Sequence, residues 1–185
     1  MTTDLETRLR RLEDIEAIRV LKARYCERCD DGYDVAALMP LFTEDAVSLH
    51  LESTSKDEVL KELVSLLGLD ARQSATLFKT LKRRENLGST GIGKGIAIPH
   101  CRSLVVSRLR LAYGRKPEGL DFKAIDGQPV YNLFLIVAPP LEVSNQYLPV
   151  LGKIAQFAKD PEVPGALASV ADPAQFLDLL RSRAP

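Results

Sequence analysis

The chain has 185 residues, enough for one medium-sized domain with an appendage or for two small domains. Its composition, with 45% hydrophobic and 27% charged residues, excludes wholesale disorder and fibrous repeats. The 25 basic residues are balanced by 25 acidic ones, which argues against nucleic-acid or membrane-surface binding, and no apolar run is long enough for membrane insertion. The N-terminus lacks a signal-peptide core and the three cysteines make no disulfide framework, so we expect a cytoplasmic protein.

A long amphipathic helix is predicted within residues 1–34. Asp4 can cap a helix that runs to about Cys29, because apolar residues recur there three or four positions apart. The apolar face must be buried, so we expect the helix to dock on the following domain or to form a homodimer with a second copy. Cys26 and Cys29 form a C-x-x-C pair, but too few further ligands remain for a zinc site, and we expect no metal.

The next segment predicts alternating helix and strand. A short helix is expected over 36–42, followed by a half-buried strand over 47–51, where apolar and polar residues alternate. Ser55 opens a helix with a capping box, and Gly68 ends it. A further helix is expected from Asp70 through residue 85.

The second half of the chain supplies most of the predicted sheet. A glycine-rich loop over 87–94 leads into a short strand at 96–98, which Pro99 stops. Strict alternation predicts a strand over 108–113, and the almost wholly apolar run 130–137 predicts a central strand covered on both faces.

Two helices are predicted to close the chain. The first spans 144–159, with Pro149 awkwardly placed in its first turns, so that it either begins near Leu148 or starts with a loose turn. The last begins at the Asp172-Pro173 cap. Together these elements predict an α/β protein: one domain over 36–185, with a mixed β-sheet flanked by helices on both faces, after the long N-terminal helix.

The most promising chemical group is His100. His50, the other histidine, lies on the polar side of a predicted strand and is expected to be a surface residue. His100 follows the end of a strand, where clefts form, and neutral imidazole is a good nucleophile near neutral pH. The preceding glycine-rich loop could direct backbone N–H groups at an anion. Spacing alone leaves open a simple turn beside a surface histidine.

The run from Arg84 to His100, RENLGSTGIGKGIAIPH, resembles the active-site signature of enzyme IIA proteins of the bacterial phosphotransferase system. The similarity is to the fructose, mannitol and nitrogen-regulatory class, and above all to the nitrogen-regulatory branch. It continues through FKAIDGQPV at 122–130 and covers about 36–185. The resemblance implies the fold of that class and no cofactor.

The resemblance also implies roles for individual residues. His100 would be phosphorylated by a small phosphocarrier of the HPr type, and Arg84 would stabilise the phosphoryl charge. The phosphate pocket would be formed by Ser89, Thr90, Gly91, Gly93 and Gly95. Many members carry a second histidine where this chain has Gln146 and Tyr147, either of which could hydrogen-bond the active imidazole.

Two kinds of downstream partner follow from the resemblance. In sugar transport the acceptor would be a cysteine-bearing enzyme IIB domain. In the nitrogen branch the phosphorylation state would regulate target proteins such as a sensor kinase or a potassium transporter. We find no IIB or IIC sequence here, which favours the regulatory type. The alternative is a regulatory interaction module with the same fold that is not phosphorylated.

Residues 1–47 are similar to the beginning of a SnoaL-like, NTF2-type domain, through LEDIEAIR at 12–19 and LFTEDAV at 41–47. That fold needs a curved sheet of several strands, and the residues to build it are missing. We therefore expect a fragment and no enzyme of that class.

Overall fold

The computed structural model describes residues 42–140 and 147–182. Several predictions lie outside these residues: the long N-terminal helix, the C-x-x-C pair, most of the helix at 36–42, most of the SnoaL-like fragment and Gln146. No helix in the described ranges is both long and apolar enough to cross a membrane.

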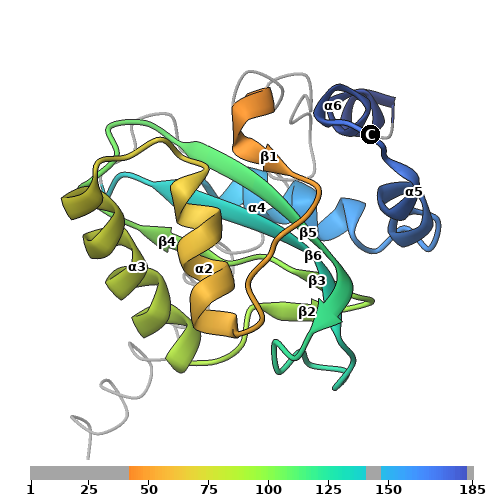
Figure 1. The fold of residues 1–185 in the computed structure, drawn as a ribbon, viewed down its shortest axis with the longest axis horizontal. Coiled ribbons are helices and arrows are strands. Elements are labelled where there is room, and N and C mark those ends of the chain that lie inside the picture. The colour runs from red at the N-terminus through yellow and green to blue at the C-terminus, as the bar shows by residue number, and fades with distance from the viewer. Residues whose placement is uncertain (1–41, 141–146, 183–185) are drawn as a thin grey trace, which may run out of the picture. The chain divides into compact units, whose positions relative to one another are not determined.

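The centre of the fold is a six-stranded mixed sheet (Figure 1). Along its main path the order is β1 (Val47–Ser48), β5 (Arg110–Leu120), β6 (Val130–Ala138), β3 (Ile96–Ala97) and β2 (Gly91–Gly93). The remaining strand, β4 (His100–Arg102), pairs with β6. β6 runs antiparallel to β5 but parallel to β3 and β4. At the two ends of the path, β1 pairs with β5 in parallel, and β2 pairs with β3 in antiparallel fashion.

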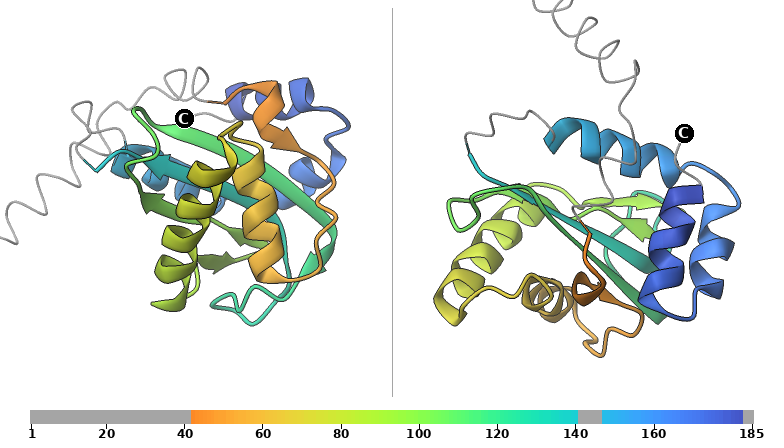
Figure 2. Two further views of the ribbon diagram at one scale, coloured as in Figure 1. Left: turned by 60° about the vertical axis from the view of Figure 1, so that its left-hand side comes forward. Right: turned by 90° about the horizontal axis from the view of Figure 1, so that it is seen from above.

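Helices cover both faces of this sheet, as predicted (Figure 2). One face carries α2 (Lys56–Ser65) and α3 (Ala71–Asn86). The other carries α4 (Tyr147–Phe157), α5 (Val163–Ser169) and α6 (Pro173–Ser182). The prediction of an α/β domain with a mixed sheet and helices on both sides is therefore confirmed.

The alternation of side chains along β6 divides the core into two layers. Phe134 and Ile136 pack among α4, α5 and α6, whereas Leu133 and Leu135 pack among α2 and α3. All four side chains are fully buried. A strand with neighbours on both edges and helices on both faces must be apolar throughout, which is the pattern that predicted a central strand.

Both helices are capped where predicted, but only half of the capping box predicted at Ser55 forms. The Ser55 hydroxyl accepts a hydrogen bond from the Glu58 N–H and donates to the Glu58 carboxylate, whereas Asp70 and Gln73 form a reciprocal capping box. α4 begins at Tyr147, which places Pro149 third in the helix, within the first turn, where its missing N–H is tolerated.

Four elements differ from the prediction. β1 ends at Ser48, after a short 3-10 turn, η2 (Glu44–Ala46), while β5 continues to Leu120 through a polar stretch. β4 and α5 were not predicted, because β4 has only three residues and the Pro164-Gly165 pair in α5 resembles a turn. α5 is held by the fully buried Val163 and Leu167.

Candidate functional site

The histidine at the start of β4 stands where an interrupted strand resumes. β3 and β4 both pair in parallel with β6, β3 near Leu133 and β4 from Ile136 onward. Between them the Pro99 carbonyl accepts a hydrogen bond from the Ile136 N–H at 2.9 Å, so the chain stays attached to β6 through the break. His100 is thereby fixed at its backbone while its side chain remains only partly buried.

The local backbone also determines which nitrogen of the neutral imidazole carries the proton. Nδ1 of His100 lies 2.7 Å from the carbonyl oxygen of Ile98. A carbonyl only accepts hydrogen bonds, so Nδ1 carries the proton and donates it. In the neutral ring the lone pair therefore resides on Nε2, which is the nucleophilic atom.

Electrostatics favour that neutral form. Burial is the largest influence and lowers the pKa of His100 below its ordinary value. The Arg84 charge lowers the pKa further, whereas the hydrogen bond to Ile98 and the Glu85 carboxylate raise it. The net lowering leaves the Nε2 lone pair available at neutral pH.

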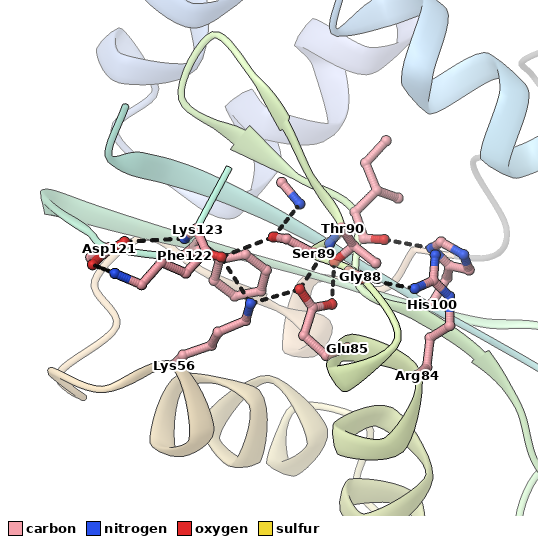
Figure 3. A network of polar contacts seen from close by, with 12 residues as sticks. Lys56, Arg84, Glu85, Gly88, Ser89, Thr90, His100, Asp121, Phe122 and Lys123 are labelled. Carbon is pink, nitrogen blue, oxygen red and sulfur yellow. Dashed lines mark hydrogen bonds and ion pairs between the residues drawn. The ribbon is translucent and has the colours of Figure 1, made fainter. Parts of the chain in front are cut away.

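Arg84 lies beside this imidazole, as Figure 3 shows. It belongs to the last turn of α3, and its Nη1 donates to the Gly88 carbonyl at 3.0 Å. This hydrogen bond ties the side chain to the loop that leads towards β2. The structure thus brings together the two residues to which the sequence assigns the central roles.

Glu85, next in the same helix, is a buried residue beside the site that the sequence analysis did not single out. Its carboxylate is buried, with the residue 8% exposed, and accepts from the Thr90 N–H at 2.8 Å and the Thr90 hydroxyl at 2.6 Å. The Lys56 ammonium from α2 completes an ion pair at 2.8 Å. A glutamate in a charged helical run gives no sign of burial, because its partners come from elsewhere in the chain.

The Ser89 hydroxyl belongs to the same polar network (Figure 3). The hydroxyl donates to the Phe122 carbonyl at 2.9 Å and accepts from the Gly91 N–H at 3.1 Å. The same Phe122 carbonyl also accepts a hydrogen bond from the Lys56 ammonium at 2.8 Å. The Ser89 and Thr90 hydroxyls thus donate to protein groups and hold the loop against neighbouring segments.

The three predicted pocket glycines lie at increasing distance from the imidazole. Gly91 is paired with Ala97, close to the break before His100, and a Cβ there would stand 2.8 Å from Ala124. The Gly95 carbonyl, beyond Gly93 in the β2–β3 turn, accepts from the Asn132 N–H. Asn132 is four residues along β6 from the partner of His100, a separation of about 13 Å.

Gly93 and Gly95 are therefore not brought together with His100. Both have positive φ angles, of 90° and 74°, as the β2–β3 turn requires. Their glycine identity follows from this turn.

An aromatic ring borders the imidazole on the α4 side, and a second arginine packs on that ring. The ring of Tyr147 lies with its centroid 6.3 Å from that of His100, and the Arg102 guanidinium stands over the same ring at 4.7 Å. Arg102 also donates to the Pro139 and Pro140 carbonyls. Sequence analysis missed Arg102, although in a strand the residue two after His100 points to the same face.

Together these groups can accept and stabilise an anionic electrophile at Nε2. The arrangement supplies a neutral nucleophilic nitrogen and a neighbouring guanidinium in a partly buried setting, where charge interactions are stronger than in water. Within the described ranges, no cluster of three or more residues that could ligate a metal is present.

Comparison with known proteins identifies related sequences. Residues 40–183 match the family model of the "Phosphoenolpyruvate-dependent sugar phosphotransferase system, EIIA 2". The chain is 31% identical to the fructose-specific EIIABC component of Bacillus subtilis over 76% of its own length, but spans only 22% of that protein. It is also 31% identical to a nitrogen regulatory protein of Bradyrhizobium diazoefficiens, over 71% of this chain and 86% of that one.

Solved structures show the same fold. The nitrogen regulatory protein IIA-Ntr of Neisseria meningitidis aligns with a TM-score of 0.72 at 30% identity, over 78% of this chain and 99% of that one. Enzyme IIA of the mannitol system from Escherichia coli, solved in complex with phosphorylated enzyme IIB, aligns with a TM-score of 0.61 at 20% identity, over 76% and 97%.

Proposed function

This chain belongs to the EIIA type 2 family of the phosphoenolpyruvate-dependent sugar phosphotransferase system, and from that premise we propose that His100 is its phosphoryl acceptor. The observation that carries the proposal is the hydrogen bond from Nδ1 to the Ile98 carbonyl, which leaves the Nε2 lone pair free. A histidine that accepts a phosphoryl group reacts through such a nitrogen.

In the proposed reaction the phosphoryl group moves from one imidazole to another. The Nε2 lone pair of His100 forms a bond to phosphorus while the P–N bond to the donor phosphohistidine breaks, and that bond's electron pair returns to the donor ring. His100 keeps its Nδ1 proton throughout. In a second transfer, the nucleophile of a downstream acceptor forms a bond to phosphorus while the P–Nε2 bond breaks and its electron pair returns to the His100 ring.

Arg84 is proposed to stabilise the charge on the transferring group. Phosphoryl transfer depends mainly on positioning and on electrostatic stabilisation of the phosphoryl oxygens. The proximity of the guanidinium to His100 supports this role. Ser89, Thr90 and Gly91 are proposed to shape the loop beside the pocket, and Tyr147 to form its wall.

The proposed donor is an HPr-type phosphocarrier. Downstream, the chain is proposed either to pass the group to an enzyme IIB domain or to regulate a bound protein, such as a sensor kinase or potassium transporter, through its phosphorylation state. The complex of the mannitol IIA relative with phosphorylated IIB supports docking of a IIB-type partner. The nitrogen regulatory relatives support the regulatory type. Leu87 and Leu104, 83% and 89% exposed near Arg84 and Arg102, offer apolar contacts for a protein partner. The cytoplasm is the proposed compartment.

The decisive experiment is reconstitution of the phosphorylation cascade. The chain is incubated with phosphoenolpyruvate, enzyme I and HPr, and its intact mass is measured at alkaline pH, where phosphohistidine survives. We expect one phosphoryl group, which fragmentation maps to His100 and which His100→Gln abolishes while circular dichroism shows retained folding. An unmodified chain in a cascade that phosphorylates a known enzyme IIA would refute the proposal and favour the unphosphorylated interaction module.

A further inference from the structure

A cavity of about 460 Å³ lies away from the proposed phosphorylation site, on the face that carries α4, α5 and α6. It is within the size range of small-molecule sites. Its lining comes from β5, β6, the β2–β3 turn, α5 and the segment after β1, and comprises His50, Lys94, Arg115, Pro117, Tyr131, Asn132, Pro164 and Ala168.

This cavity is distinct from the site around His100. Arg115 on β5 pairs with Asn132 on β6. Asn132 lies four residues along β6 from Ile136, the partner of His100, and this separation corresponds to about 13 Å. The lining contains neither Arg84 nor His100. The inference that follows therefore does not depend on the proposed phosphotransfer.

Arg115 contributes a positive charge to the lining and retains N–H donors that are not paired with described residues. Its Nε donates to the Leu49 carbonyl at 3.1 Å, and its Nη1 donates to the Leu167, Ala168 and Val170 carbonyls. These bonds fix the guanidinium plane against the end of α5. Nη2 makes no hydrogen bond to any residue that the structure describes, so two N–H donors remain for a ligand.

Asn132 adds a buried neutral donor. The residue is 4% exposed, and its Oδ1 accepts a hydrogen bond from the Tyr113 hydroxyl at 2.6 Å. Burial raises the pKa of Tyr113, so the hydroxyl keeps its proton. This bond fixes the amide, and its Nδ2 has no hydrogen-bond partner among the described residues. A buried amide group whose N–H donors are unpaired and that lines a cavity can donate a hydrogen bond to an oxygen atom of a ligand.

Lys94 contributes the second permanent charge from an unusual backbone conformation. Its φ is 54°, in the left-handed region that favours glycine or asparagine, and such strain concentrates at functional positions. Its ammonium donates to the Lys159 carbonyl, just beyond α4, at 2.7 Å. Within the described ranges this ammonium forms no ion pair with a carboxylate, so its charge is not neutralised.

No carboxylate lines the cavity. Two acidic groups act on lining residues from outside it. Asp126 accepts from the Lys94 main-chain N–H at 2.9 Å, and Glu118 interacts electrostatically with His50 but forms its ion pair with Lys116 at 3.1 Å. The remaining lining residues are apolar or aromatic, among them Pro117, Tyr131 and Pro164.

We propose that this cavity binds a small organic anion, whose phosphate or carboxylate contacts Arg115, Lys94 and Asn132 and whose compact, ring-sized body packs on Tyr131 and the prolines. Two cationic residues and one amide residue line the same cavity, and these are the groups that charge-assisted recognition of an oxyanion uses. The apolar part of the lining should favour an organic anion with a hydrophobic group over an inorganic anion.

The test is a titration of the full-length, ¹⁵N-labelled chain with phenyl phosphate and with benzoate, and with phenol as the neutral counterpart. We expect saturable amide shifts at Lys94, Arg115 and Ala168, and binding of at least one anionic probe about tenfold tighter than phenol, the effect of one charge-assisted hydrogen bond. Lys94→Gln should weaken the binding of that probe about fivefold or more.

Lys123→Gln is the matched control, because Lys123 also has a positive φ, of 59°, and lies outside the lining. It should bind as the wild type does. Arg115→Gln is avoided as the main variant, since it also removes the bonds to α5. Absence of saturable shifts, equal affinity for phenol, unchanged binding in Lys94→Gln or shifts confined to Arg84 and His100 would each overturn the proposal. Binding that persists in His100→Gln would separate it from phosphotransfer.

Discussion

Both carboxylate oxygens of Glu85 accept hydrogen bonds from a single residue, Thr90, one from its N–H and one from its hydroxyl. This pairing joins the end of α3, which carries Arg84, to the loop whose Thr90 carbonyl accepts from the Ile98 N–H at 3.0 Å. The arginine and the segment that orients the imidazole are therefore held by one buried carboxylate.

Glu85→Gln should lower the free energy of unfolding by about 2 kcal/mol, because an amide loses the ion pair with Lys56 and presents N–H groups to donors. Urea denaturation measures the change. Asp57→Asn is the control, since Asp57 pairs with Lys82 at the surface, where both side chains are nearly half exposed. That change should stay under about 1 kcal/mol. Equal effects for both variants would contradict a special role for the buried carboxylate.

Arg84→Gln should slow phosphorylation of His100 by about a hundredfold, the typical effect of removing a group that stabilises transition-state charge. The fold should be retained, because among the described residues the side chain donates a hydrogen bond to the Gly88 carbonyl alone. Arg83→Gln, the exposed neighbour in the same helical turn, should transfer at the wild-type rate. Rapid-quench kinetics with phosphorylated HPr give the rates, and an unchanged rate in Arg84→Gln would remove the arginine from the mechanism.

The pH dependence should report the lowered pKa of His100. Protonation of Nε2 removes the nucleophile, so the phosphorylation rate should stay level as the pH is lowered to about 6.5 and should decline only at more acidic pH, around the lowered pKa. Between the folded-state pKa and about 6.5 the unfolded chain binds more protons, so the free energy of unfolding should decrease as the pH falls through that range. NMR titration of the His100 ring provides the check, and a midpoint at or above 6.5 would be incompatible with this account.

Tyr147 is expected to act through its ring, which contacts both His100 and Arg102. Tyr147→Phe keeps that ring and should phosphorylate within about twofold of the wild-type rate, whereas Tyr147→Leu removes the cation–π contact and should be about fivefold slower. If the phenylalanine variant is as slow as the leucine variant, the hydroxyl is the group that matters.

Removal of residues 1–34 should leave a chain that unfolds cooperatively and accepts phosphate on His100. The family match begins at residue 40, and Phe42 already packs in the core, with its ring centroid 5.7 Å from that of Phe176. Thermal denaturation and the reconstituted cascade test both expectations. Loss of the cooperative transition would show that the N-terminal segment covers core surface.

Local signals in the sequence predicted the larger elements well. The caps at Ser55 and Asp70 and the apolar run in β6 depend on neighbouring residues or on simple burial, and all are confirmed. The short elements were missed because their stability comes from distant partners: β4 exists because β6 offers its edge, and α5 because two side chains reach the core.

The candidate site divides in the same way. Family resemblance and strand-end position singled out His100 and Arg84, which lie together in the structure. The glycine-rich loop was treated as one pocket, but half of it forms the β2–β3 turn, since the positive φ of Gly93 and Gly95 serves chain reversal. Glu85 depends on Lys56, 29 positions away, a relationship that no local pattern contains.

The interruption between β3 and β4 determines which nitrogen can react. In an unbroken parallel strand, the backbone oxygen of Ile98 would be committed to ladder pairing or turned away from the ring. Here Pro99 takes over the bond to β6, and the preceding oxygen is left to receive the imidazole proton. A two-residue irregularity in backbone pairing thus selects the tautomer, so any change that restored regular pairing would alter reactivity without touching a single atom of the histidine.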